Sequence, residues 1–452
     1  MENHESFEKP FISTVTVEVE SDYVPETFLF GKIILNKNIS KLNYFCSLIH
    51  FLLMTFTFVS VDTLQPMLFK SSSYLKVSKD EIGSQNAQIL LVDIIVKIIF
   101  APIYGILADR YGRTRVLIFG YLSMAAALFF MPFSSNIYPQ FCIFRIIYAQ
   151  GSMAITTAPL LADYVETTTK GRASAINVIM ASLGAVISAY LINNLLTNNM
   201  SLKVSCIAIA IIIAIISMLY AAGLKHGKYF VTKKNEKSLS IKTSLAIGFV
   251  AAKNHWILLG YITSFLGRSN SIVLTLFLNL WAKSFYPNTD EGDSEANIQA
   301  ETLAGICYTI ILFFSILYGL LVEKWNKFCI LGVSYIFCII GMNLFWVCDN
   351  PKSGLSYGIL AIVGVGFSGL DTISLYLVNN YAWEEHRGKI NGVASLFGVI
   401  GILIVSLLGG YLFDSWSKNA PFLLFEIFTS LGLLILVIIC LKWVQLKKKN
   451  II

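Results

Sequence analysis

Charged residues are scarce in this chain, and their scarcity indicates its class. Asp, Glu, Lys and Arg together make up 13% of the 452 residues, against about a quarter in an ordinary soluble domain. Hydrophobic residues make up 56% and include 32 Phe. A chain of this length could bury a large soluble core and still keep the usual surface charge. The shortage of charge therefore predicts that most of the chain lies in lipid.

Motifs of several function classes are also missing. The sequence has no GxxxxGK[ST] loop to hold the phosphates of ATP, no CxxC pair and no visible nucleophile–base set. Its eight cysteines lie in or beside apolar segments, which indicates packing residues rather than zinc ligands or disulfides. We therefore expect no enzyme, no cofactor and no metal site. The first forty residues lack a basic start followed by an apolar core, so we expect no cleavable signal peptide.

What the sequence does contain is a series of long apolar segments. A helix that crosses a bilayer needs about 20 such residues. The pattern predicts an all-α membrane protein with twelve transmembrane helices at 43–68, 87–107, 115–133, 137–160, 173–196, 203–224, 256–282, 303–322, 328–348, 356–380, 389–413 and 421–442. We expect a cytoplasmic N-terminal tail, a first half, a cytoplasmic central loop, a second half and a cytoplasmic C-terminal tail, at 1–41, 42–224, 225–254, 255–443 and 444–452.

The net charge of +7 is placed at the ends of the apolar segments. It forms no basic face with stacking aromatics, so we expect no nucleic-acid partner. The loop after the second segment, the central loop and the C-terminus are basic, whereas the loop "PNTDEGDSEANIQAE" is acidic. Basic loops face the cytoplasm, which predicts that both termini are cytoplasmic. We expect a multi-pass protein of the plasma membrane or an endomembrane.

Two stretches of the first half recur in the second half. "YGILADRYGRTRVL" from Tyr104 aligns without gaps with "YGLLVEKWNKFCIL" from Tyr318, and "YVETTTKGRASA" aligns with "YAWEEHRGKING" at nearly the same offset. An even number of spans separates the copies, so the halves have the same orientation. The repeat predicts two pseudo-symmetric six-helix bundles. Gly112 aligns with Asn326, which predicts a left-handed turn at both positions.

The first repeated stretch carries a family signature. The sequence resembles the major facilitator superfamily, whose signature G-x-L-A-D-R-x-G-R-[RK]-x-[RK] follows the second span. This chain has Gly105, Leu107, Ala108, Asp109, Arg110, Gly112 and Arg113 in place, with Thr114 as a departure. A second resemblance is "RIIYAQG" in the fourth span. The resemblance implies a fold of two six-helix bundles and a cytoplasmic gate between them. The gate residues that it implies are Gly105, Asp109, Arg110, Gly112, Arg113, Arg115, Asp163, Lys389, Glu323 and Lys324.

The pairings expected in this gate follow from the side of the membrane on which each residue lies. Asp109 ends the second span near the start of the eleventh, where Lys389 is a candidate partner. Arg113 or Arg115 is a candidate partner for Asp163 or Glu166. The alternative is that these residues are ordinary basic anchors of the positive-inside kind.

Four charges lie inside predicted spans, where charge is costly and usually functional. Asp62, Arg145, Arg268 and Asp371 occupy spans one, four, seven and ten, which in the family line a central cavity. They either form two structural pairs, Asp62–Arg145 and Arg268–Asp371, or bind a charged solute or a proton. Asp93 and Lys97 in span two are four residues apart and can satisfy each other.

These observations predict a secondary active transporter that moves a small, charged or zwitterionic solute by alternating access. Protons are a candidate coupling ion, with Asp62 as the first candidate for their carrier because a carboxylate in a low dielectric is readily neutralised. Arg268 is the first candidate for binding an anionic group, since its planar guanidinium suits carboxylate or phosphate. The expected partners are this solute and the lipid bilayer, and we expect a monomer. The alternative is a transport-inactive sensor or scaffold in the membrane.

Overall fold

The computed structural model describes most of the chain between residues 26 and 448. The described ranges are 26–29, 31–70, 74–75, 77, 81–156, 160–197, 200–225, 241–287, 289–383 and 386–448. The predicted N-terminal tail, central loop and C-terminal tail therefore lie partly outside the described residues.

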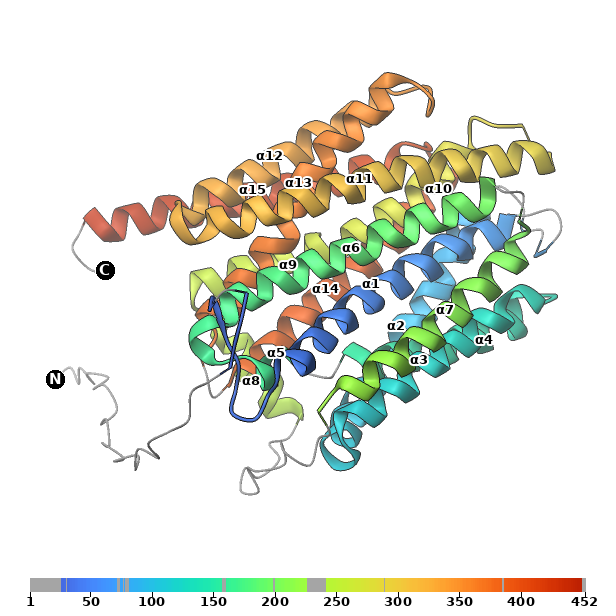
Figure 1. Ribbon diagram of the computed structural model, residues 1–452. Helices are drawn as coiled ribbons and strands as arrows, with labels where there is room; N and C mark the ends of the chain where they lie inside the picture. The colour runs from blue at the N-terminus through green and yellow to red at the C-terminus, as the bar shows by residue number, and fades with distance from the viewer. Residues whose placement is uncertain are drawn as a thin grey trace.

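Nearly all of the described residues are helical (Figure 1). A short hairpin of β1 (Thr27–Phe28) and β2 (Ile33–Ile34) precedes α1 (Lys41–Lys70), α2 (Ile82–Tyr111), α3 (Arg113–Phe130), η1 (Met131–Phe133), η2 (Ile137–Phe141), α4 (Cys142–Thr156), α5 (Leu160–Tyr164), η3 (Thr167–Thr169), α6 (Lys170–Thr197) and α7 (Leu202–Gly223). The rest of the chain forms α8 (Ile241–Ala251), α9 (His255–Ile272), η5 (Val273–Phe277), α10 (Leu278–Lys283), α11 (Asp290–Lys324), α12 (Lys327–Leu344), η6 (Phe345–Val347), α13 (Gly354–Tyr381), α14 (Arg387–Ser415) and α15 (Ala420–Lys448).

The long helices run back and forth along one axis. Helix α1 begins and α15 ends on the left in Figure 1, and we call this the terminal end and the opposite one the distal end. The α2–α3 junction and the α11–α12 junction, which carry the two repeated stretches, both lie at the terminal end (Figure 1). This agrees with the parallel orientation that the repeat predicts for the two halves.

Eleven helical segments in the described part of the chain are long and apolar enough to cross a membrane. The fourth predicted span, 137–160, is not among them: η2 precedes α4, whose described length is 15 residues, and residues 157–159 before α5 lie outside the described part of the chain. Large apolar side chains such as Leu219, Phe313 and Leu441 are 59–70% exposed on the outside of the helices. Such surfaces suit lipid rather than water, so the chain is an all-α membrane protein.

The two aligned turn residues have different backbones, and the predicted left-handed turn at Asn326 is wrong. Gly112 has a φ of 90°, which glycine adopts without a steric penalty. Asn326 has a φ of −64° and a ψ of 118°, and its side chain accepts a hydrogen bond from the amide of Phe328. Asn326 therefore caps the start of α12, a role for which asparagine is also preferred.

Two segments expected to be tail or loop contain packed structure. The β1–β2 hairpin docks beside α5, where the amide of Asn36 donates to the carbonyl of Tyr164 at 3.0 Å and that of Glu166 donates to the carbonyl of Ile34 at 3.0 Å. In the central region, α8 packs against α14 and accepts a hydrogen bond from Tyr261 at the carbonyl of Gly248. Both segments are too short to show an apolar periodicity from which they could be predicted.

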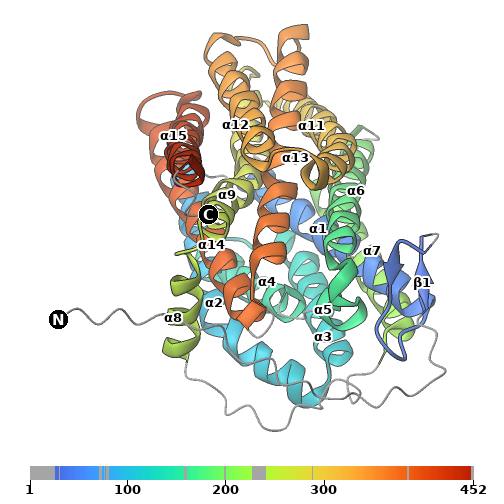
Figure 2. The ribbon, with the colours of Figure 1, turned by 90° about the vertical axis from the view of Figure 1, so that its left-hand side faces the viewer.

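The two halves meet mainly along two pairs of helices, and α6 also contacts α13 while α1 contacts η5 and α10. Helix α2 packs against α14, and α6 packs against α11. Figure 2 views the bundle from the terminal end, with α11, α12 and α13 above and α2, α3 and α4 below. The four predicted intramembrane charges are divided between the halves. Helices α1 and α4 lie in the first half, and α9 and α13 lie in the second.

Candidate functional site

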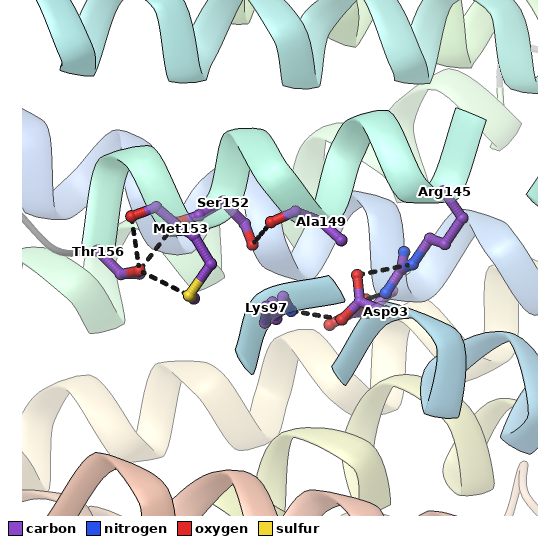
Figure 3. A network of polar contacts seen from close by, with 8 residues as sticks. Asp93, Lys97, Arg145, Ala149, Ser152, Met153 and Thr156 are labelled. Carbon is purple, nitrogen blue, oxygen red and sulfur yellow. Dashed lines mark hydrogen bonds and ion pairs between the residues drawn. The ribbon is translucent and has the colours of Figure 1, made fainter. Parts of the chain in front are cut away.

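A chain of ion pairs joins three helices in the interior of the first half. Arg145 of α4 donates from Nη2 to Oδ1 of Asp62 on α1 at 2.8 Å. Its Nε lies 3.3 Å from Oδ1 of Asp93 on α2, and Oδ2 of Asp93 lies 2.5 Å from Nζ of Lys97. Figure 3 shows Asp93 between Lys97 and Arg145. The structure therefore unites the Asp62–Arg145 and Asp93–Lys97 pairs, which the sequence analysis treated separately.

The inner members of this ion network are fully buried. The side chains of Arg145 and Asp93 are 1% and 2% exposed, whereas those of Asp62 and Lys97 are 20% and 22% exposed. Two acids and two bases give the network no net charge, which limits the cost of placing it in a low dielectric. Buried charges tolerate this environment only when they are paired, so each member depends on its neighbours.

Some hydrogen-bonding capacity remains unused at this site. Within the described residues, Nη1 of Arg145 and the hydroxyl of Tyr148 are buried without a hydrogen-bond partner. The Arg145 guanidinium also lies over the Tyr148 ring, 4.6 Å from its centroid. The sequence analysis missed Tyr148, although its spacing of three residues from Arg145 places both on one helix face. The two groups can donate hydrogen bonds to an acceptor brought by another molecule.

The charges of the second half are arranged differently. Asp371 on α13 accepts a hydrogen bond from Nδ2 of Asn270 on α9 at 3.1 Å. Arg268 is exposed, and its Cγ lies against the backbone of Gly398 on α14. Among the ion pairs of the described residues, none joins Arg268 to Asp371. Sequence alone could not show that an amide two residues along α9 would be the hydrogen-bond partner of Asp371.

At the terminal end, Arg113 at the start of α3 pairs with Asp163 of α5. This is one of the pairings that the sequence analysis considered. Arg115 and Lys324 are exposed, and Lys389 is half-buried. The side chains of the remaining predicted gate residues lie outside the described part of the structure, and these are Gly105, Asp109, Arg110 and Glu323.

The described hydrogen bonds between the halves lie from the distal end to about the middle of the bundle. The amide of Ser84, at the start of α2, donates to Oδ2 of Asp414, near the end of α14, at 2.9 Å. Gly83 and Gly410 bring the two backbones together, since a Cβ on Gly410 would lie 2.8 Å from the carbonyl oxygen of Gly83. A carboxylate beside the start of a helix is stabilised by the helix dipole.

A second contact joins α6 to α11. Asn193 donates from Nδ2 to Oγ1 of Thr302 at 2.8 Å, and the hydroxyls of Tyr190 and Thr309 lie 3.4 Å apart. Together with the α2–α14 contact, these bonds join the two halves from the distal end to about the middle of the bundle.

Comparison with known proteins decides the family. The family model described as Major Facilitator Superfamily matches residues 44–404 and 296–450, which together cover most of the chain. The chain belongs to the Major Facilitator Superfamily. The solved structure of a mutant of the nucleoside transporter NupG is similar over 87% of this chain and 98% of its own, with a TM-score of 0.66 and 14% identity. This superfamily fold agrees with the two six-helix bundles predicted from the sequence.

Three curated superfamily relatives are distant. Magnetosome protein MamH of Paramagnetospirillum magneticum is 23% identical, and the alignment covers 83% of this chain and 86% of MamH. Magnetosome protein MamZ of Magnetospirillum gryphiswaldense is 22% identical over 80% of this chain but only 57% of MamZ. The class H tetracycline resistance protein of Pasteurella multocida is 23% identical over 75% of this chain and 83% of its own.

The buried ion network generates a stability prediction. Arg145→Met replaces the arginine with an apolar side chain of similar length. Asp62 and Asp93 are then left with one cation, Lys97. We expect a loss of about 3–5 kcal/mol in stability, the usual cost of breaking a buried pair from one side. Thermal unfolding of the purified protein in detergent measures it.

The control for Arg145→Met is Lys352→Met. Lys352 pairs with Glu295 at 3.3 Å, and both side chains are more than half exposed, at 58% and 54%. Its loss should lower the melting temperature far less than the loss of Arg145, because exposed ion pairs contribute little to stability. Equal melting temperatures for the two variants would contradict a structural role of the network.

Proposed function

We propose that this superfamily member is a secondary active transporter of a small solute that carries a charged or zwitterionic group. The observation that carries the proposal is the pair of unused donors, Arg145 Nη1 and the Tyr148 hydroxyl, beside a buried ion network. A buried donor without a partner costs about 1–3 kcal/mol. A solute acceptor would remove this cost, which favours binding at this position.

Alternating access is supported by the contacts that join the two halves toward the distal end of the bundle. The distal end is held by contacts between α2 and α14 and between α6 and α11. In the proposed cycle the terminal end faces the cytoplasm and opens while these distal contacts are formed. When the distal contacts break, the signature residues at the α2–α3 junction close the cytoplasmic side.

The charge that selects the solute is proposed to be Arg268. Its side chain is exposed on α9, in the second half, whose described residues form no buried ion network like that of Arg145. A planar guanidinium binds carboxylate or phosphate through two parallel hydrogen bonds. A transport-inactive scaffold gives no reason for keeping unused donors next to Arg145, whereas a sensor would use them to bind a solute without moving it.

The test is uptake by the purified protein in liposomes from a panel of amino acids, carboxylates, nucleosides and phosphorylated solutes. Each solute is offered with and without a pH gradient. Accumulation of one class above that in empty liposomes supports transport, and dependence on the gradient identifies proton coupling. Binding of a solute without flux would favour the sensor.

Arg268→Gln should abolish uptake of an anionic or zwitterionic solute without loss of the fold. Asp371 loses the electrostatic attraction of Arg268 but keeps its hydrogen bond to Asn270, so the carboxylate retains one polar partner. Uptake by this variant should fall at least tenfold while its melting temperature stays within a few degrees of the wild type. Arg115→Gln, which removes an exposed arginine of the terminal end, is the control for a general loss of positive charge. Normal uptake by Arg268→Gln would remove Arg268 from the binding site.

Asp414→Asn should weaken closure of the distal end. The charge beside the start of α2 is worth about 1 kcal/mol, so the ratio of open to closed molecules should rise about fivefold. Spin labels on cysteines at Met200 and Leu355, both exposed residues of opposite halves, report this ratio as a distance distribution. The exposed Cys329 is first changed to serine.

Asp349→Asn is the matched control, because Asp349 is an exposed acid near the same end of the bundle. An unchanged distance distribution in Asp414→Asn would show that the Asp414 contact does not hold the distal end closed.

A further inference from the structure

Helix α11 contains a buried acid that the sequence analysis assigned to a loop. Glu301 is 3% exposed, and its Oε2 has no hydrogen-bond partner among the described residues. The apolar segment was expected to begin at residue 303, but α11 begins at Asp290 and its span at Ser294. Glu301 therefore lies seven residues inside the span, at a depth of about 10 Å for a rise of 1.5 Å per residue.

Glu301 is next to a contact that closes the distal end. Thr302, the following residue, accepts the hydrogen bond from Asn193 of α6 that joins the two halves. A change in the charge of Glu301 therefore takes place one residue away from this contact between the halves. When the α6–α11 contact breaks, the buried carboxyl is brought closer to water.

The ion pairs of the described residues leave Glu301 without a cation. On α11, Glu295 pairs with Lys352 at the surface, and Tyr308 lies within electrostatic reach of Glu301. The titratable and charged groups on the elements packed against α11 include Lys283 of α10, which has a partner of its own, Tyr190 of α6, and Tyr357 and Asp371 of α13. Arg172 of α6 and Tyr376 and Tyr381 of α13 belong to the terminal ends of these helices. An ionised Glu301 would thus be a buried anion without compensation, which is strongly unfavourable.

A second buried oxygen shares this helix face. Asn297 is four residues before Glu301 and 5% exposed, and its Oδ1 also lacks a hydrogen-bond partner in the described structure. Residues four apart on a helix are neighbours. A protonated carboxyl has one O–H donor, so one proton could satisfy both acceptors. A hard cation would need about six oxygen ligands, and the described residues hold no group of three candidate metal-binding side chains here.

We propose that Glu301 is a proton-binding site that controls closure of the distal end. A proton from the distal solution forms an O–H bond with the carboxylate, and the neutral acid then tolerates burial when α6 and α11 close. Loss of the proton places a charge beside the contact and opens it. The proposal rests on the alternating access proposed above and names protonation as the event that biases it.

Glu301 suits this role better than Asp62. Asp62 accepts a charge-assisted hydrogen bond from Arg145 at 2.8 Å, which holds it ionised. Glu301 has no such cation, so its neutral form is the one favoured by the closed structure. The two acids therefore have different tasks, with Asp62 fixed in a network and Glu301 able to change its charge.

Infrared spectroscopy tests proton binding without any solute. The full chain in liposomes should show a protonated carboxyl band that disappears as the pH is raised. Glu301→Gln should lack this band, whereas Glu295→Gln, on the same helix but exposed, should keep it. An unchanged band in Glu301→Gln would overturn the proposal. If Glu301→Gln fails to fold, Glu301→Asp is measured instead. Its carboxyl band should be shifted, and an unshifted band would also overturn the proposal.

Distance measurement with the Met200 and Leu355 labels tests the control of closure. In the wild-type background, raising the pH should increase the ratio of open to closed molecules at least fivefold. In Glu301→Gln, a permanently neutral side chain, the distal end should stay closed at every pH. Persistence of the full pH response in this variant would overturn the proposal, as would a response to sodium at fixed pH. If the infrared and distance results are both as expected but the screen detects no uptake, the proposed transport is refuted and proton binding by Glu301 stands.

Discussion

The arrangement of the first half depends on Arg145. One guanidinium contacts the carboxylates of Asp62 and Asp93 and so ties α4 to α1 and α2. In a low dielectric neither acid could remain charged alone, and the hydrocarbon offers no water to replace the missing partner. The three helices are thereby fixed relative to one another as a unit. In the proposed cycle, movement would be concentrated between the halves, where the described contacts are hydrogen bonds rather than buried ion pairs.

The helix pair α2–α14 carries an acid near the end of each member. Asp414 ends α14 and faces the start of α2 at the distal end. Asp109 lies near the end of α2 and, from the sequence, is expected to face the start of α14 at the terminal end. The spacing is the same in both, since Gly410 precedes Asp414 by four residues as Gly105 precedes Asp109. A rigid rocking motion that separates one end brings the other together, so each acid is suited to one state of the cycle.

The sequence predicted the helices and the repeat well because both depend on local patterns. Apolar length decides which segments can span a bilayer, and the aligned stretches at Tyr104 and Tyr318 indicated two halves of equal orientation. Asn326 was misjudged because asparagine suits both a left-handed turn and a helix cap, and only the backbone distinguishes them. Glu301 was assigned to a loop because a charged residue at the start of an apolar segment is typical of a loop. The union of two ion pairs through Arg145 could not be predicted, since it depends on how three helices pack.

The distribution of charge also limits what the proposed solute can be. The network of the first half is neutral, so Arg145 and Tyr148 can offer hydrogen bonds there without adding net charge. In the second half, Arg268 is exposed and Asp371 is hydrogen-bonded to an amide, so the cation is the more available of the two. A solute that bridges the halves would therefore place a polar acceptor against the first half and its anionic group against the second. In the proposed cycle, closing the terminal end around such a solute would bury Arg268, which is exposed in this conformation, together with a partner.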